Sequence, residues 1–317
     1  MLANRRIAVL GYGSQGRAWA LNLKDSGCNI LIGLPERSKS RARAKRDGFN
    51  VILSIGKAVG GANVIVFAFP DHLQGRVFEN DIRPNLNRKS SLIFLHGFSI
   101  HFKTIIPPND CDIILLAPLA PGMAVREKYI KGESVRCFYS IHRNRTGEAK
   151  TVFKTLTKGL RINRREMIKT TFADEAIGDI FGEQAVLCGG LSQLIRTGYD
   201  TLVQAGLSSD KAYLEVAYQL DLIIDLIKIF GIEGMLKRIS VAARYGAALT
   251  GPKIIDQEVK MKMKKVLREI KTGQFAARLN SLNSRRMIEL NRRLKDLTSP
   301  SFEKAARKFS PLKKNKG

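Results

Sequence analysis

The sequence IAVLGYGSQG, from Ile7 to Gly16, decides the fold class of this chain. Four apolar residues read as a short β-strand, and glycines follow it in the spacing GxGxxG. At the end of a strand this spacing is typical of a dinucleotide-binding unit: Gly11 permits a tight turn, Gly13 lets a pyrophosphate approach the backbone, and Gly16 lets the next helix pack closely. The alternative is a glycine turn that binds nothing.

The segment after the second expected strand bears on the choice of nicotinamide cofactor. That strand ends at Gly33 and is followed by Leu-Pro-Glu-Arg-Ser-Lys-Ser. Arg37, Ser38 and Ser40 supply a cation and two hydroxyl groups, which suit the 2′-phosphate of NADPH. Glu36 is the kind of residue that binds the ribose hydroxyls of NADH. We favour NADPH, and the alternative is that these residues only form a solvated loop.

The rest of the first half alternates apolar runs with helical patterns, as expected for a doubly wound α/β sheet. The expected strands are Ile7–Leu10, Asn29–Gly33, Val64–Phe69, Leu92–Leu95, Ile113–Leu116 and Cys137–Ile141. After about Arg165 only helical periodicity remains, for example over Phe181–Leu194, Ser209–Phe230 and Ile255–Ile270. We therefore predict a Rossmann domain at 1–165, an all-α domain at 166–300 and a basic, flexible tail at 301–317.

The formal net charge of +26 is the abnormal feature of the composition. It would suit a nucleic acid or an acidic membrane surface, but the cations are scattered and accompany no nucleic-acid motif. We favour a basic enzyme surface with no specific nucleic-acid partner.

The four cysteines show no metal-binding spacing. The most apolar run, Leu220–Ile232, is too short and too charged to span a bilayer. We expect a cytoplasmic protein with no membrane partner.

Two helical patterns carry carboxylates at four-residue spacing. Glu175, Asp179 and Glu183 share one face of a helix, and Glu215 and Gln219 form a second such pair. Because like charges at this spacing repel, a hard divalent cation such as Mg²⁺ would offset the cost. Facing helices of this kind could build a two-metal site, although an exposed acidic face explains the row equally well.

Several motifs together resemble the ketol-acid reductoisomerases of the short-chain class. They are GYGSQGxAxALNLKDSG near the N-terminus, HGFxIH from His96, APxAPG ending at Gly122, DIFGEQAVLCGG ending at Gly190, and YGxxxTGPK from Tyr245. The resemblance extends from about Ile7 to about Lys271, and the segment FGEQAVLCGG is highly specific. It favours metal binding for the acidic row.

The resemblance implies a two-step reaction in valine, isoleucine and leucine biosynthesis. An alkyl group of 2-acetolactate or 2-aceto-2-hydroxybutyrate migrates with the help of Mg²⁺, and NADPH then reduces the ketone to a 2,3-dihydroxy acid. The family also implies a knotted helical domain and a homodimer or larger homo-oligomer. Its partner subunit supplies the helix that contains Glu215.

The family's functional positions transfer to this chain residue by residue. His96 matches the active-site histidine near the nicotinamide, and Ser240 matches a substrate-contacting serine. Without the resemblance, a core histidine and an ordinary helix serine would be the interpretations. The implied metal ligands are Asp179, Glu183, Glu215 and Gln219. The full set of expected cofactor-binding residues is Gly11, Tyr12, Gly13, Ser14, Gln15, Gly16, Arg37, Ser38, Ser40 and Gly122.

Two positions depart from the family. Leu119 stands where the family has lysine in APKAPG, and Gln219 stands where it has a second glutamate. Leucine has no hydrogen-bond donor, and a neutral amide is a weaker magnesium ligand than a carboxylate. We expect impaired isomerisation, and we interpret the pair as charge-compensating. The alternatives are a non-catalytic NADPH-binding paralogue and a simple 2-keto acid reductase.

Overall fold

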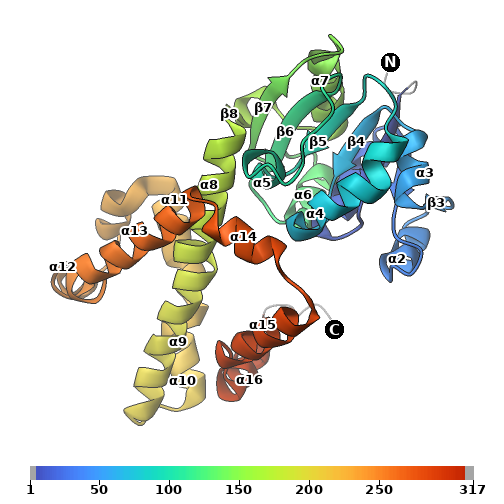
Figure 1. The fold of residues 1–317 in the computed structure, drawn as a ribbon. Coiled ribbons are helices and arrows are strands. Elements are labelled where there is room, and N and C mark those ends of the chain that lie inside the picture. Colours follow the sequence, from blue (N-terminus) through green and yellow to red (C-terminus); the bar gives the residue numbers. More distant parts are fainter. Residues whose placement is uncertain (1–4, 311–317) are drawn as a thin grey trace. The chain divides into compact units, whose positions relative to one another are not determined.

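The computed structural model describes residues 5–310, and the chain divides into two compact units (Figure 1). The first unit runs to Gly178 and includes Leu279–Ser281. The second unit comprises Asp179–Arg278 and the residues from Leu282 onward. Within the described residues, no helix is both long and apolar enough to cross a membrane.

An eight-stranded mixed sheet forms the centre of the first unit, in the order β3-β2-β1-β4-β5-β6-β7-β8. Neighbouring strands are parallel except β6 and β7, which are antiparallel. Leu10 pairs with Gly33 on one side and with Phe67 on the other, so three strands end together where the strand order reverses. The strands are β1 Arg6–Leu10, β2 Asn29–Gly33, β3 Ile52–Leu53, β4 Val64–Phe67, β5 Ser91–Phe94, β6 Asp112–Pro118, β7 Cys137–Arg143 and β8 Met167–Lys169.

Helices cover both faces of this sheet and create two hydrophobic cores. Alternate side chains of β1 enter opposite cores: Ile7 and Val9 lie in one, Ala8 and Leu10 in the other. The first core includes side chains of α1, α6 and α7, and the second includes side chains of α3. The helices of this unit are α1 Ser14–Asp25, α2 Ser40–Arg46, α3 Ile55–Gly60, α4 Asp71–Val77, α5 Phe98–His101, α6 Gly122–Ile130 and α7 Ala149–Gly159.

Every secondary-structure element among the described residues of the second unit is a helix. Helix α8, Phe172–Gly182, leads into it and is followed by a π-helical segment, Glu183–Leu187. A second π-helical segment, Leu214–Tyr218, separates α10 from α11. The remaining helices are α9 Gly189–Gln204, α10 Ser209–Tyr213, α11 Leu220–Leu236, α12 Val241–Ile254, α13 Gln257–Lys271, α14 Gln274–Asn280, α15 Ser284–Asp296 and α16 Pro300–Phe309.

The predicted fold class, a Rossmann-type sheet domain followed by a helical domain, is confirmed, with local differences. The sequence pattern missed β3 and β8, which are two and three residues long. Because β8 follows Arg165, the expectation that no strand returns there was wrong. Part of the basic segment predicted to be flexible forms α16, whose Phe302 ring packs against Tyr199 and Tyr213. Residues 311–317 of that segment lie outside the described residues.

Candidate active site

The glycine turn lies at the point where the strand order of the sheet reverses. Gly11 has φ +97°, and a Cβ placed on it would lie 2.4 Å from the carbonyl oxygen of Ala68, which follows β4. A Cβ on Gly16 would lie 2.5 Å from the carbonyl oxygen of Gly11. Both positions therefore require glycine for packing within the protein.

Gly13 differs from Gly11 and Gly16 because a Cβ there would meet no protein atom within 4 Å. The residue is the N-cap of α1, so the first N–H groups of that helix point toward this open space. Free helix N–H groups and the helix dipole favour a phosphate group. The observed geometry fits a dinucleotide pyrophosphate at Gly13.

The loop that begins α6 packs directly on this turn. The Gln15 side-chain nitrogen donates to the carbonyl oxygen of Ala120 at 2.7 Å. A Cβ on Gly122 would lie 2.1 Å from the carbonyl oxygen of Ser14. The structure thus brings the predicted residues Ser14, Gln15 and Gly122 together, and the closeness of the two loops leaves no room for a larger residue at position 122.

Tyr12 is buried in the core rather than exposed in the turn. Its hydroxyl donates to the Asp47 carboxylate at 2.9 Å, and Arg17 binds the same carboxylate through two nitrogens at 2.7 and 2.8 Å. Burial, followed by the neighbouring Asp47, raises the pKa of the Tyr12 hydroxyl. The Arg17 guanidinium lowers the pKa of Asp47. This cluster ties the glycine turn to the end of α2, and the sequence analysis missed both Arg17 and Asp47.

The loop after β2 presents the residues expected to recognise the cofactor's ribose. Arg37 is exposed, Ser38 and Ser40 are half-buried, and the backbone N–H of Ser40 donates to the Ser38 hydroxyl at 3.3 Å. Arg41, which the sequence analysis did not select, donates to the carbonyl oxygens of Leu34 at 3.1 Å and Ile52 at 2.5 Å. Its guanidinium therefore fixes the shape of the loop.

His96 follows β5 at the same end of the sheet as Gly11. Its Nδ1 lies 3.0 Å from an Asp71 carboxylate oxygen. The next residue, Gly97, donates its backbone N–H to the buried carboxylate of Glu175 at 2.5 Å. Glu175 is therefore engaged with the His96 loop, although the helical spacing grouped it with Asp179 and Glu183.

The four predicted metal ligands are exposed side chains of the second unit. Glu183 begins one π-helical segment, Glu215 lies in the other, and Gln219 directly follows it. The Gln219 amide nitrogen donates to the carbonyl oxygen of Leu214 at 3.3 Å, which leaves the amide oxygen as the donor for a metal. Carboxylate and amide oxygens suit Mg²⁺ chemically, but the described part of this single chain contains no cluster of three potential ligands.

Leu119, the other residue that departs from the family, and Ser240 each take part in a hydrogen bond with the backbone of a nearby residue. Leu119, in the loop between β6 and α6, is 45% exposed, and its backbone N–H donates to the carbonyl oxygen of Arg136 at 2.9 Å. Ser240 is the N-cap of α12, and its hydroxyl accepts the backbone N–H of Ala243 at 3.1 Å. A capping hydroxyl that accepts this bond can still donate its own hydrogen to a ligand.

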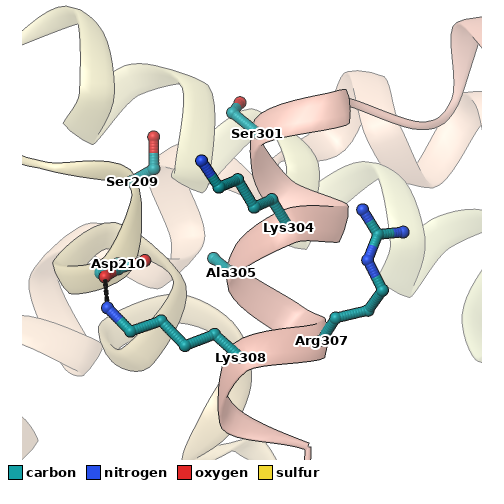
Figure 2. A pocket seen from close by; sticks show the side chains of 7 residues that line it. All are labelled: Ser209, Asp210, Ser301, Lys304, Ala305, Arg307 and Lys308. Atoms are coloured by element: carbon teal, nitrogen blue, oxygen red, sulfur yellow. Dashed lines mark hydrogen bonds and ion pairs between the residues drawn. The ribbon is translucent and has the colours of Figure 1, made fainter.

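Two of the larger cavities differ in the residues that line them. One, of about 710 Å³, opens beside the glycine turn and is lined by residues that include Gly13, Ser14, Arg17, Arg43 and Gly122. The other, of about 700 Å³, lies between α10 and α16 and contains none of the predicted site residues (Figure 2). Its Lys308 pairs with Asp210, while Lys304 extends toward Ser209 and Ser301. The first cavity is therefore the one adjoining the candidate site.

A glycine turn at the point where the strand order of this sheet reverses, with open space for a pyrophosphate, defines the class of dinucleotide-binding proteins. Residues 1–165 match the model of the acetohydroxy acid isomeroreductase NADPH-binding domain, and residues 172–313 match that of the ketol-acid reductoisomerase C-terminal domain. The chain therefore belongs to the ketol-acid reductoisomerase family, the NADPH-binding enzymes of branched-chain amino acid biosynthesis.

Individual relatives agree with this assignment. The ketol-acid reductoisomerase (NADP(+)) of Chloroherpeton thalassium is 45% identical over 276 residues, which are 87% of this chain and 81% of the relative. An NADH-preferring ketol-acid reductoisomerase from an uncultured archaeon has a solved structure with TM-score 0.91 and 39% identity, covering 98% of this chain and 95% of that one. A semialdehyde dehydrogenase NAD-binding protein of Cupriavidus necator, 18% identical with TM-score 0.59 over 84% of this chain and 99% of its own, shares the fold alone.

Proposed function

We propose that this chain catalyses the Mg²⁺-dependent alkyl migration and NADPH-dependent reduction of 2-acetolactate or 2-aceto-2-hydroxybutyrate, with a slowed migration step. The observation that carries the proposal is the retention of Asp179, Glu183 and Glu215 in a chain whose glycine turn keeps open space at Gly13. A decayed protein that only binds nucleotide has no need for these carboxylates.

In this proposal, different residues bind the cofactor, the magnesium and the substrate. The glycine turn and α1 bind the pyrophosphate, and Ser38, Ser40 and Arg37 bind the 2′-phosphate. The Asp179, Glu183 and Glu215 carboxylates and the Gln219 amide oxygen hold Mg²⁺, which when bound polarises the substrate carbonyl and lowers the pKa of its hydroxyl. His96 lies beside the nicotinamide, and Ser240 contacts the substrate.

The cofactor is NADPH in this proposal, although the archaeal relative prefers NADH. Support comes from the cation and two hydroxyl groups at positions 37, 38 and 40, together with the NADPH-binding character of the matched domain. The exposed Arg37 guanidinium matches a phosphate dianion better than an uncharged ribose hydroxyl. The Glu36 carboxylate works in the opposite direction, so NADH is the competing cofactor in the assay.

Leu119 is the reason for proposing slow migration. A lysine at this place would supply a positive charge and hydrogen-bond donors, whereas the exposed leucine supplies neither. Loss of a group that acts on the transition state commonly lowers a rate on the order of a hundred- to ten-thousand-fold. We further propose that Leu119 and Gln219 compensate each other, since together they remove one positive and one negative charge.

An assay with two substrates tests this function. We expect Mg²⁺-dependent NADPH oxidation to be fast with 3-hydroxy-2-ketoisovalerate, which needs reduction alone, and slow with 2-acetolactate. Leu119→Lys combined with Gln219→Glu should raise the acetolactate rate by more than the two single effects combined, because each change alone leaves a charge without its partner; effects that simply add would refute the pairing. Equal, fast rates on both substrates would refute the role of Leu119, and no turnover of either would leave a non-catalytic NADPH-binding paralogue.

We also propose that the active unit is a homodimer. Helix α12, all of which the structure describes, has no buried residue, and Val241 and Tyr245 are 71% and 68% exposed. A helix with this much exposed apolar surface needs a partner to cover it. Among the described residues of one chain no three potential metal ligands come together, which supports the same proposal because a partner subunit would bring its own Glu215 helix.

A further inference from the structure

The contact between His96 and Asp71 joins the ends of two neighbouring strands. His96 follows β5 and Asp71 begins α4 after β4, and Nδ1 of the imidazole lies 3.0 Å from a carboxylate oxygen of Asp71. The histidine and aspartate side chains are 20% and 27% exposed, so solvent screens the pair only in part. An ionised carboxylate only accepts hydrogen bonds, so Nδ1 must carry a proton. In a neutral imidazole the lone pair is then on Nε2.

The backbone around this contact is fixed from the α4 side. Gln74 is one helical turn after Asp71, and its amide nitrogen donates to the carbonyl oxygen of Phe69 at 2.8 Å. The hydroxyl of Ser99 donates to the amide oxygen of Gln74, also at 2.8 Å. Gln74 and Ser99 are both buried, so these bonds are protected from water. The start of α4 is therefore tied to the loop that contains His96.

The same loop is fixed from the α8 side. The buried Glu175 accepts the backbone N–H of Gly97, and a Cβ on Gly97 would lie 2.3 Å from the carbonyl oxygen of Phe172. The main chain next to His96 thus has contacts on two sides. Its imidazole ring lies 6.0 Å from the Phe98 ring, and the Asp71 carboxylate contacts its Nδ1.

We propose that Asp71 is the positioning residue of His96, fixing its ring orientation and keeping the proton on Nδ1. The proposal rests on the function proposed above, in which His96 lies beside the nicotinamide. Asp71 acts on the reaction only through His96. Sequence reasoning did not select Asp71, because 25 residues separate it from its partner.

The elements around His96 contain other titratable groups, which the test must distinguish from Asp71. They are His72 and Arg76 of α4, His101 of α5, and Asp174, Glu175 and Asp179 of α8. Burial lowers the pKa of His101. Because the chain has only four histidines, NMR of the full-length protein labelled with ¹⁵N-histidine resolves each of them, and His96→Gln identifies the signal of His96.

Three substitutions at position 71 separate charge from hydrogen bonding. Asp71→Ala removes both, and we expect the His96 signal to shift from the Nδ1–H form toward a mixture of the two neutral forms. Asp71→Asn can still accept the Nδ1–H bond but lacks the charge, so it should keep the Nδ1–H form and lower the His96 titration midpoint. Asp71→Glu should restore the titration midpoint in part.

Kinetics give the second readout. Asp71→Ala should lower kcat on the order of ten- to a hundredfold, while KM for NADPH stays within about twofold, because the cofactor is held elsewhere. Asp81→Asn is the matched control: Asp81 is an exposed carboxylate shortly after α4, and its replacement should change neither the His96 signal nor kcat.

Two results would overturn the proposal. One is a folded Asp71→Ala protein whose His96 retains the Nδ1–H form and an unchanged titration midpoint. The other is a fall in kcat that only accompanies a fall in melting temperature, with the His96 signals unaltered. If the chain turns over no acetohydroxy acid, the proposed function fails, but the NMR measurement still decides whether Asp71 orients His96.

Discussion

Gly13 differs from Gly11 and Gly16 in the space that lies beside its Cα. Gly11 and Gly16 are needed by the protein itself, since a Cβ at either would meet backbone oxygen at 2.4 or 2.5 Å. At Gly13 the space is open, and its N-cap backbone lies in the extended region with φ −76°. Packing within the protein therefore does not require glycine at position 13, as expected if it serves the proposed cofactor.

We expect Gly13→Ala to separate cofactor binding from stability. The melting temperature should stay within about 2 °C of the parent, because the new methyl group meets no protein atom. NADPH affinity should fall about tenfold or more, because the methyl group occupies the approach of the pyrophosphate. Calorimetric titration and thermal melting measure the two effects on one sample.

Gly11→Ala provides the contrast to this variant. Its Cβ would collide with the Ala68 carbonyl and would occupy a left-handed backbone conformation, so the melting temperature should fall together with affinity. If Gly13→Ala bound NADPH as tightly as the parent, the pyrophosphate would not lie over this residue.

At the residue scale, the sequence predicted what depends on local chemistry. The glycines of the turn and the hydroxyls after β2 could be proposed from the sequence because the role expected of each depends only on its own backbone or side chain. Arg41, Asp47 and Asp71 were missed because their roles depend on partners brought close only by the sheet topology. Glu175 was assigned to an acidic row by helical spacing, and its contact with Gly97 comes from a segment 78 residues away.

At the scale of elements, the cluster of Tyr12, Arg17 and Asp47 connects the glycine turn to α2. Three hydrogen bonds converge on one carboxylate whose side chain is 14% exposed. Because Arg17 and Tyr12 donate to the ionised form, the pKa of Asp47 is lower in the folded chain than in the unfolded one. This contribution to stability is present above the unfolded pKa and is lost as pH falls through the folded value.

Asp47→Asn should therefore destabilise the chain at neutral pH but much less in acid. We expect a loss on the order of 1–2 kcal/mol near pH 7, because an amide receives weaker hydrogen bonds than a carboxylate. The difference between the variant and the parent should shrink below about pH 4, where Asp47 of the unfolded parent chain begins to be protonated while Asp47 of the folded chain is still ionised. Urea unfolding at several pH values measures it, and a difference that stays constant from pH 7 to pH 3 would contradict this account.

Two π-helical segments and two short strands are elements that the periodicity of the sequence did not predict. The sequence indicated continuous helices through Glu183 and Glu215, but each residue lies in a π-helical segment. One extra residue per segment shifts the side chains that follow, and such segments are frequent at functional sites. An apolar pattern of period 3.6 cannot reveal one inserted residue. Strands β3 and β8 were missed for a different reason, because two or three residues are too few to show alternation.

At the scale of the whole molecule, the two units differ in how they bury apolar side chains. Large buried side chains such as Trp19 and Phe67 lie in the first unit, on either side of the sheet. In the second unit, Leu187, Leu222 and Ile232 are each more than 60% exposed. The helical periodicity predicted the helices of this unit correctly in kind, but it could not reveal that one chain leaves many of their apolar faces uncovered.

Mixing two inactive variants tests whether the second chain completes the site. In a dimer with shared sites, Asp179 and Glu183 of one subunit work with Glu215 of the other. Asp179→Asn and Glu215→Gln should each abolish Mg²⁺-dependent turnover when alone. Co-expressed, they should regain about a quarter of the parent activity, because half of the dimers are mixed and each mixed dimer has one intact site and one doubly altered site.

Varying the relative amounts of the two variants distinguishes a shared site from a site built within one chain. Activity should be greatest at equal amounts of the two variants and fall to nothing at either extreme, whereas a site built within one chain would give no activity at any ratio. Asp179→Asn co-expressed with Glu183→Gln is the matched control, because both changes lie on the same side of the shared site and every site in that mixture lacks one carboxylate. Recovery in the control, or none in the test pair, would show that Asp179 and Glu215 do not act across the interface between two subunits.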